Sequence, residues 1–125
     1  METIENKVNK AYEDNKAIIE IARKAEEAHA KYAKAIEQVS KQEKTKKRDV
    51  LLYLLSGRPT SMLIALQKFG VGSYRDVIYD LRQEGWKISH YDGESKNNYG
   101  TATFHYHYMS DFPVEYIKQR TENPY

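Results

Sequence analysis

Neither glycine nor proline occurs between Glu2 and Ser56, and this stretch constrains the fold more than any other feature of the sequence. Its first forty residues are rich in Ala, Glu, Lys and Ile, which are acceptable to good helix formers. Because glycine and proline are the residues that most often end a helix, we expect one long N-terminal helix.

Apolar residues recur along this predicted helix at alternating intervals of four and three, which is the spacing of a coiled coil. The seam consists of Ile4, Val8, Ala11, Asn15, Ile18, Ala22, Ala25, His29, Tyr32, Ile36 and Val39. If Ile4 takes heptad position d, Asn15 takes position a, where a lone Asn fixes the register of a parallel pair. The seam therefore predicts a homodimer that is held by the N-terminal helix.

The same stripe also allows the helix to fold back on its own domain. Ala11, Ala22 and Ala25 bury little area in a two-stranded seam. Ile19 and Ile21 widen the apolar face beyond such a seam, and the flanking positions offer no pairs of opposite charge. Both arrangements stay open at this point.

A second unit is expected after a run of ten polar residues, 40–49, which indicates a hinge or a helix boundary. We place the boundary between an oligomerisation helix, 1–44, and a domain, 45–125. Gly57, Gly70 and Gly85 end three short helices, and Thr60 or Ser61 caps the second of them. The residues expected to face inward are Val50, Leu51, Leu54, Leu55, Met62, Leu63, Leu66, Phe69, Val77, Ile78 and Leu81.

After Gly85 the periodicity changes from helical to two-residue, which is typical of strands. One strand is expected around residues 86–89 and another over 101–108, with residues 91–100 as the loop between them. A short last helix follows Pro113. The predicted fold class is therefore α+β, a long helix followed by a small domain of three helices and a hairpin.

This order of helices and strands is that of a winged helix-turn-helix. The run from Thr60 to Ile88 resembles the small helix-turn-helix domains of bacteriophage and prophage regulatory proteins, at Thr60, Ala65, Gly70, Leu81, Arg82, Gly85 and Ile88. The resemblance implies binding of double-stranded DNA by a phage or mobile-element regulator. The interval from Ala65 to Gly70 is one residue longer than in the tight repressor-type turn, so that motif's contact positions are not transferred.

Polar and basic side chains on the third short helix, at the start of the first short helix and in the loop between the strands are candidates for DNA contact. Arg and Gln can make paired hydrogen bonds to guanine and adenine, and Lys and Arg can neutralise phosphates. The candidates are Lys46, Lys47, Arg48, Ser73, Arg75, Tyr79, Arg82, Gln83 and Lys96. Asp76 and Asp80 on the same helix would repel phosphates, which keeps open a protein-interaction module or inhibitor of a host protein.

The remaining composition limits the chemistry of the chain. It has no cysteine, and it contains no G-x-S-x-G elbow, P-loop or G-x-G-x-x-G motif, so we expect no enzyme and no cofactor. His90, His105 and His107 alternate with other residues in the manner of exposed strand positions, and we assign no metal site to them. No stretch approaches the roughly 18 apolar residues of a membrane span, and a cytoplasmic protein is expected.

Overall fold

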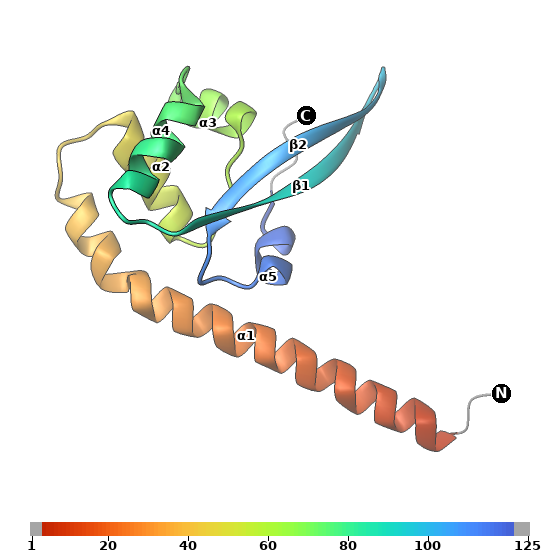
Figure 1. Cartoon of the computed structure of the whole chain (residues 1–125). Coiled ribbons are helices and arrows are strands. Elements are labelled where there is room, and N and C mark those ends of the chain that lie inside the picture. The colour runs from red at the N-terminus through yellow and green to blue at the C-terminus, as the bar shows by residue number, and fades with distance from the viewer. Residues whose placement is uncertain (1–3, 122–125) are drawn as a thin grey trace.

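The structure is a computed structural model that describes residues 4–121, with the side chains of residues 13–94, 96 and 98–121. Its elements follow one another as α1 (Ile4–Ser40), α2 (Lys46–Leu55), α3 (Met62–Phe69), α4 (Tyr74–Gln83), β1 (Ile88–Asn97), β2 (Gly100–Met109) and α5 (Val114–Gln119) (Figure 1). The predicted class, α+β with a long first helix, is confirmed.

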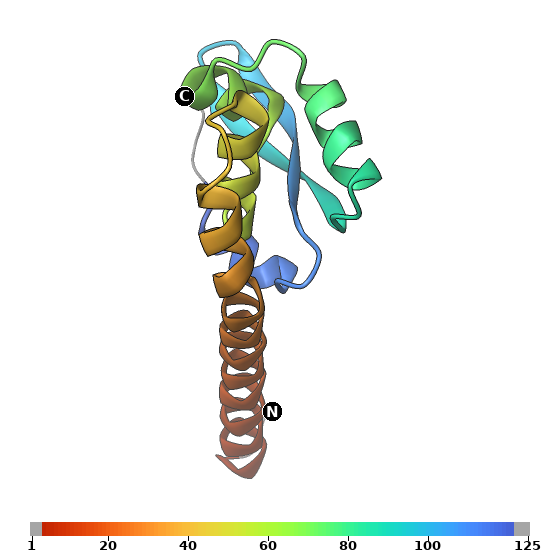
Figure 2. The same cartoon turned by 90° about the vertical axis from the view of Figure 1, so that its left-hand side faces the viewer.

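Helix α1 has 37 residues, which at 1.5 Å per residue is a length of about 55 Å. Its C-terminal part packs on α2 and α5, while its N-terminal part projects away from every other element (Figures 1 and 2). The N-terminal part of α1 therefore extends from a small domain that the remaining elements form (Figure 2).

The C-terminal part of the predicted seam belongs to the core of its own chain. Ala25, Tyr32 and Val39 are buried, and Ile36 packs against the same cluster. His29 lies with its Nε2 atom 2.7 Å from the hydroxyl of Tyr116 on α5. For these residues the fold-back arrangement is correct, because the domain offers an apolar surface in the same chain. The core consequently extends across the predicted boundary at residue 44.

The N-terminal part of the seam has a different environment. Asn15, Ile18 and Ala22 are exposed, and Ile18 keeps 63% of its accessible surface. The side chains of Ile4, Val8 and Ala11 lie outside the residues whose side chains the structure describes. The prediction of a homodimer is untested for this part of the helix.

The first two short helices begin at side-chain caps, and the cap of the second is Ser61 of the two alternatives that the sequence indicates. Thr45 Oγ1 accepts a hydrogen bond from the Arg48 amide at 3.1 Å, and Ser61 Oγ accepts one from the Ile64 amide at 3.2 Å. Gly57 follows α2 with a φ of 82°, and an added Cβ would lie 3.1 Å from ring atoms of His29 and Phe112. A side chain at this position would therefore strain the backbone and press on the α1–α5 contact.

Helix α3 is rotated relative to the sequence prediction. Ile64 and Ala65 are its buried residues, while Met62 and Leu66 keep 64% and 52% of their surface exposed. The prediction that Met62 and Leu66 face inward is wrong, because an eight-residue helix has room for only one short buried face and Ile64 and Ala65 occupy it. Two large apolar side chains are thereby left at the surface.

The hairpin is longer and its loop shorter than predicted. β1 and β2 pair antiparallel from Ile88 with Met109 to Asn97 with Gly100, so most of the predicted loop, 91–100, is strand. Only two residues connect the strands, and Gly100 adopts a φ of 128° directly after them. Polar residues such as those of β1 enter a strand readily when a partner strand satisfies their backbone groups. Thr60, before α3, adds a bridge to His107 of β2.

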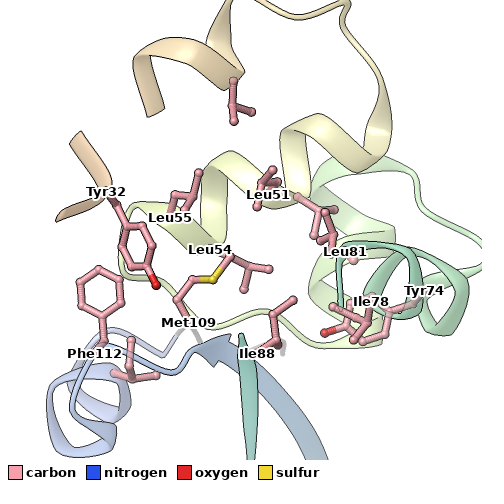
Figure 3. Close-up of a cluster of buried hydrophobic side chains, with 14 of the residues drawn as sticks. Tyr32, Leu51, Leu54, Leu55, Tyr74, Ile78, Leu81, Ile88, Met109 and Phe112 are labelled. Carbon is pink, nitrogen blue, oxygen red and sulfur yellow. The ribbon is translucent and has the colours of Figure 1, made fainter. Parts of the chain in front are cut away.

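The core lies where α2, α4, the base of the hairpin and the C-terminal part of α1 converge. Leu54, Leu81 and Met109 are fully buried there, and Phe112 extends the cluster toward Tyr32 of α1 (Figure 3). Burial of such side chains contributes about 1.5–3 kcal/mol each, so this convergence fixes α4 and the hairpin relative to each other.

Candidate functional site

A groove of about 830 Å³ lies between α4, the start of α3 and the hairpin. Its walls are largely apolar, because Met62 and Leu63 of α3, Ile78 and Tyr79 of α4 and Phe104 of β2 line it. The volume falls in the range of about 300–1,000 Å³ that is typical of ligand sites. This groove is the candidate functional site, and the hairpin and α4 bound it on facing sides.

The charged residues that line the groove are all basic. Arg75 and Arg82 come from α4, and His90, His105 and His107 come from the hairpin. Among the described residues, no Asp or Glu lines the groove. The site therefore combines apolar walls with positive charge along one side.

Helix α4 separates its basic and acidic side chains onto two faces. Arg75, Tyr79 and Arg82 line the groove at intervals of four and three. Asp76 and Asp80 follow the same intervals one residue later, do not line the groove, and are exposed. Gln83 continues this second row, so it lies with the two carboxylates. Of the predicted contact residues on α4, the structure brings together Arg75, Tyr79 and Arg82, and leaves Gln83 apart.

The guanidinium of Arg82 is held in place by the hairpin. Its Nη2 atom donates a hydrogen bond of 2.9 Å to the carbonyl oxygen of Ile88 at the start of β1. Because a guanidinium has five N–H donors, this bond orients the group and leaves donors for other partners. None of the described ion pairs joins Arg82 to an acid of its own helix.

Polar groups on the deepest side of the groove satisfy one another. The hydroxyl of Tyr74 lies 2.8 Å from Nδ1 of His107 and donates toward the carbonyl oxygen of Thr60 at 3.1 Å. Burial, together with the positive charge of Arg82, lowers the pKa of His107 to about 4. Burial also raises the pKa of Tyr74. At neutral pH both side chains are therefore uncharged, and Arg75 and Arg82 are the lining residues with a permanent positive charge.

The predicted phosphate-binding residues at the start of α2 have structural partners. Lys46 Nζ donates to the carbonyl oxygen of Gly70 at 2.8 Å, and Lys47 pairs with Glu84 at the end of α4, which raises the pKa of Lys47. Arg48 donates to the carbonyl oxygens of Ser40 and Gln42, at 3.2 and 2.9 Å. Arg48 thus closes the C-terminal end of α1.

The last two predicted contact residues lie at the ends of the site. Ser73 is exposed at the N-cap of α4 without a side-chain capping bond, and Lys96 is exposed near the tip of the hairpin. Neither of them lines the groove.

Of the thirteen lining residues, sequence reasoning gave a site role only to Arg75, Tyr79 and Arg82 and missed the other ten, among them Met62, His90 and Phe104. Met62 was expected in the core, and His90 and Phe104 were expected in strands without a role in a site. The two-residue alternation places His90 and His107 on the same face of the hairpin, where their rings lie 6.2 Å apart. That alternation is a usable signal, whereas the packing of α4 against this face is not visible in a single sequence.

Other classes of site find no support in the described part of the chain. No group of three or more His, Asp or Glu residues there is arranged to hold a metal ion. None of the described helices is long and apolar enough to cross a membrane.

Comparison with known proteins identifies no relative of this chain. No family model matches the chain, and neither a curated protein nor a solved structure matches it significantly.

Proposed function

We propose that this chain is a sequence-specific binding protein for double-stranded DNA, in the manner of phage or mobile-element regulators, and that residues 45–109 form a winged helix-turn-helix. The order of elements supports the fold, because α2, the Thr60 bridge, α3, α4 and the hairpin follow one another. In such a domain α4 takes the place of the recognition helix and the hairpin that of the wing.

The observation that carries the proposal is the row of Arg75, Tyr79 and Arg82 along one face of α4. Arg makes paired hydrogen bonds to guanine, and Tyr contacts phosphate or a thymine methyl group. Asp76 and Asp80 would repel phosphates, but they lie on the neighbouring face. Arg75 and Tyr79 are exposed, and the tip of the hairpin carries Lys96 where it would meet the DNA backbone.

The proposal includes a homodimer that forms through the free part of α1. Ile18 and Ile19 keep 63% and 67% of their surface exposed on the N-terminal part of α1. A lone helix segment in water is marginally stable, so a second helix packed on this side would stabilise it. Two domains joined in this way would bind two DNA half-sites.

Fluorescence anisotropy with a duplex selected by the protein from a random library tests the proposal. We expect binding at about 50 mM salt that weakens strongly at 200 mM, because phosphate contacts release counterions. Arg75→Gln should weaken binding to the selected duplex about tenfold, whereas Lys24→Gln, which removes the same charge from α1, should leave it unchanged. If the parent protein binds no duplex at the lower salt concentration, the proposal is wrong.

Exposed apolar side chains in and beside the groove and at the hairpin tip favour a second candidate function. Met62, Leu66 and Tyr79 are each more than half exposed, and Tyr99 at the hairpin tip is 98% exposed. Aromatic residues and Met are enriched where proteins bind other proteins. A protein-interaction module or inhibitor of a host protein is therefore the alternative. It gains support if the parent protein fails to bind DNA and Met62→Gln abolishes capture of a purified partner protein.

A further inference from the structure

DNA contact accounts for only one side of the groove between α4 and the hairpin. Duplex DNA presents phosphates and the polar edges of bases, with thymine methyl groups as its apolar feature. The groove also contains Met62, Leu63, Ile78 and Phe104, whose apolar atoms have no match on a DNA backbone. An apolar hollow of this size is a feature that the proposed DNA contact leaves unexplained.

The groove fits a molecule with an apolar body and a negative charge. Its volume of about 830 Å³ suits a small organic molecule better than a folded partner, which would bury a broad surface instead. Its fixed charges are the guanidinium groups of Arg75 and Arg82, and no described lining residue is acidic. Arg82 is already oriented by its bond to the Ile88 carbonyl oxygen, so little side-chain freedom is lost when an anion binds there.

The other polar groups near the groove already bind one another, which leaves the arginines to bind such an anion. The Tyr74 hydroxyl, the His107 ring and the Thr60 carbonyl oxygen are bonded to one another. His105 Nδ1 is paired with Asp92 Oδ1 at 2.6 Å. The arginines can instead meet a carboxylate or sulfonate in the paired geometry that guanidinium groups favour.

We propose that the groove between α4 and the hairpin binds a small aromatic organic anion, whose ring lies on Met62, Leu63, Ile78 and Phe104 and whose acidic group binds Arg75 and Arg82. The bound anion occupies the same arginines that are proposed to contact DNA. If the chain binds DNA as proposed above, the anion therefore competes with DNA and acts as an effector that releases it.

Two probes separate the apolar and the ionic parts of the proposal. The first is 1-anilinonaphthalene-8-sulfonate, and the second is N-phenyl-1-naphthylamine, which has the same rings without the sulfonate. We expect both to bind the full chain at one saturable site per chain, with the sulfonate bound more tightly. Arg75→Gln should weaken sulfonate binding about tenfold and leave the uncharged probe within twofold, because the lost charge affects only the anion. Met62→Glu should weaken both probes, and the sulfonate more strongly, because it removes an apolar contact and adds a repelling charge.

Control variants show where the probes bind. Lys24→Gln removes a remote charge and should retain sulfonate binding, whereas Met62→Gln removes an apolar contact without adding a charge and should weaken both probes to a similar extent. Ile18→Ser and Ile19→Ser test the exposed apolar face of α1 as the place of binding. If these α1 variants abolish probe binding, or if Arg75→Gln and Met62→Glu leave sulfonate binding unchanged, the groove is not the site and the inference is wrong.

A competition experiment keeps this inference distinct from the proposed function. If the sulfonate binds as expected and the parent protein binds no DNA, the anion site stands and the proposed function fails. If DNA binds and saturating sulfonate leaves its affinity unchanged, the DNA function stands and the effector role is overturned. Release of DNA with the same half-saturation concentration as direct sulfonate binding supports both.

Discussion

The two parts of α1 have similar sequences and opposite environments. Residues 25–39 bury Ala25, Tyr32 and Val39 against α2 and α5, whereas none of the side chains of residues 13–24 is buried. The same heptad spacing runs through both parts. The spacing of apolar residues thus reveals that a helix has an apolar stripe, but what covers the stripe depends on whether the rest of the chain reaches it.

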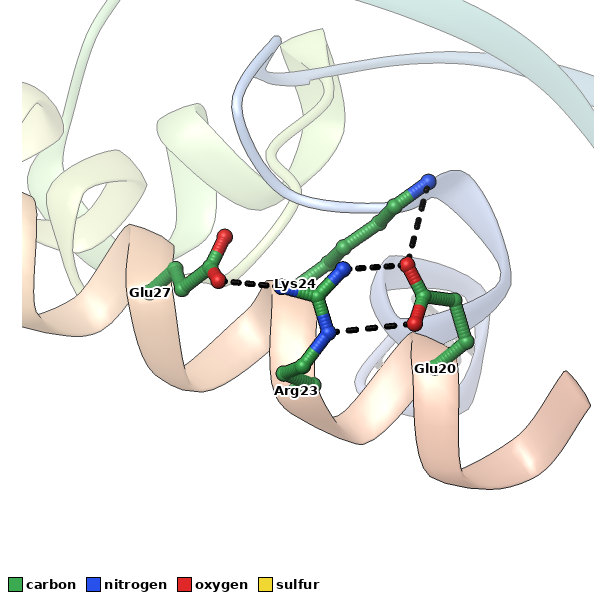
Figure 4. A network of polar contacts seen from close by, with 4 residues as sticks. All are labelled: Glu20, Arg23, Lys24 and Glu27. Carbon is green, nitrogen blue, oxygen red and sulfur yellow. Dashed lines mark hydrogen bonds and ion pairs between the residues drawn. The ribbon is translucent and has the colours of Figure 1, made fainter. Parts of the chain in front are cut away.

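Exposed charged side chains pair with one another on the N-terminal part of α1. Arg23 pairs with Glu20 and Glu27, and Lys24 reaches Glu20, so one side of this segment carries a network of ion pairs (Figure 4). The apolar residues Ile18 and Ile19 lie in the same segment and are exposed. We therefore expect substitutions in residues 25–39 to change the stability of the domain and those in residues 13–24 to change its assembly.

The largest effect is expected from Tyr32→Ala. Tyr32 keeps 6% of its surface exposed, packs beside Phe112 and donates a hydrogen bond to Asp111 Oδ2. Removal of a buried aromatic ring costs about 3–5 kcal/mol of unfolding free energy, as measured by urea denaturation. Tyr32→Phe retains the ring and should cost only about 1 kcal/mol. A loss under 1 kcal/mol for Tyr32→Ala would mean that α1 does not belong to the domain core.

Acid should destabilise the contact between α1 and α5. Burial, with the positive charge of Arg120, lowers the pKa of His29 below its ordinary value of 6.5, so the unfolded chain binds the proton more readily. This contribution to stability is complete above pH 6.5 and is lost as the pH falls toward the lowered pKa. His107, with a pKa of about 4, acts in the same direction, and after allowance for the partial exposure of its ring it should lower the unfolding free energy by about 1–3 kcal/mol between pH 7.5 and 4. The loss at His29 adds to this effect.

The variant His29→Gln isolates the share of α1 in this pH dependence. It should be less stable than the parent at pH 7.5 and should lose less on acidification, because the His107 contribution is retained. Urea denaturation at four pH values measures both quantities. Parallel curves for the parent and the variant would contradict a role for His29.

A change of assembly without loss of folding is expected from Ile18→Ser combined with Ile19→Ser. Both side chains are more than 60% exposed, and surface substitutions alter domain stability by no more than about 0.5 kcal/mol. Sedimentation equilibrium should show a dimer for the parent and a monomer for the double variant, with unchanged near-ultraviolet circular dichroism. If the parent protein is a monomer at micromolar concentration, the proposed dimer is wrong.

The smallest effect is expected from Arg23→Gln, which opens the ion-pair network drawn in Figure 4. All of its members are exposed or nearly so, and solvent screens such pairs. The urea midpoint of the domain should not change measurably, even though hydrogen bonds to Glu20 lower the pKa of that carboxyl group. A clear fall in the midpoint would show that this segment contributes to the core after all.

Local signals predicted much of the fold. The polar run up to residue 49 and the alternative caps Thr60 and Ser61 predicted helix starts, and Gly57 and Gly70 predicted helix ends, because caps and left-handed turns depend on one or two residues. The length of the hairpin was underestimated, since the polar residues of β1 form a strand only when β2 pairs with them. The surface on which residues 25–39 pack could not be predicted either, because α2 and α5 form it together.

Part of the candidate site was predictable, because some of its residues share one face of a single helix. Helical spacing places Arg75, Tyr79 and Arg82 on one face of α4, which a single sequence can show. Gln83 was predicted to contact DNA together with these residues, but it lies beside Asp76 and Asp80 and does not line the groove. Met62, His90 and Phe104 joined the site only through packing between α3, α4 and the hairpin. Long-range packing of this kind leaves no periodic signal in the sequence.

The central claim is that the row facing the hairpin, and not its neighbour on α4, contacts DNA. Anisotropy titrations of Arg75→Gln and Gln83→Ala against the duplex selected by the parent protein and against random duplex test this claim directly. We predict that Arg75→Gln loses about 1–3 kcal/mol on the selected duplex and little on random duplex, while Gln83→Ala binds both as the parent does. Equal losses for the two variants, or parent-like binding by a folded Arg75→Gln, would contradict the account.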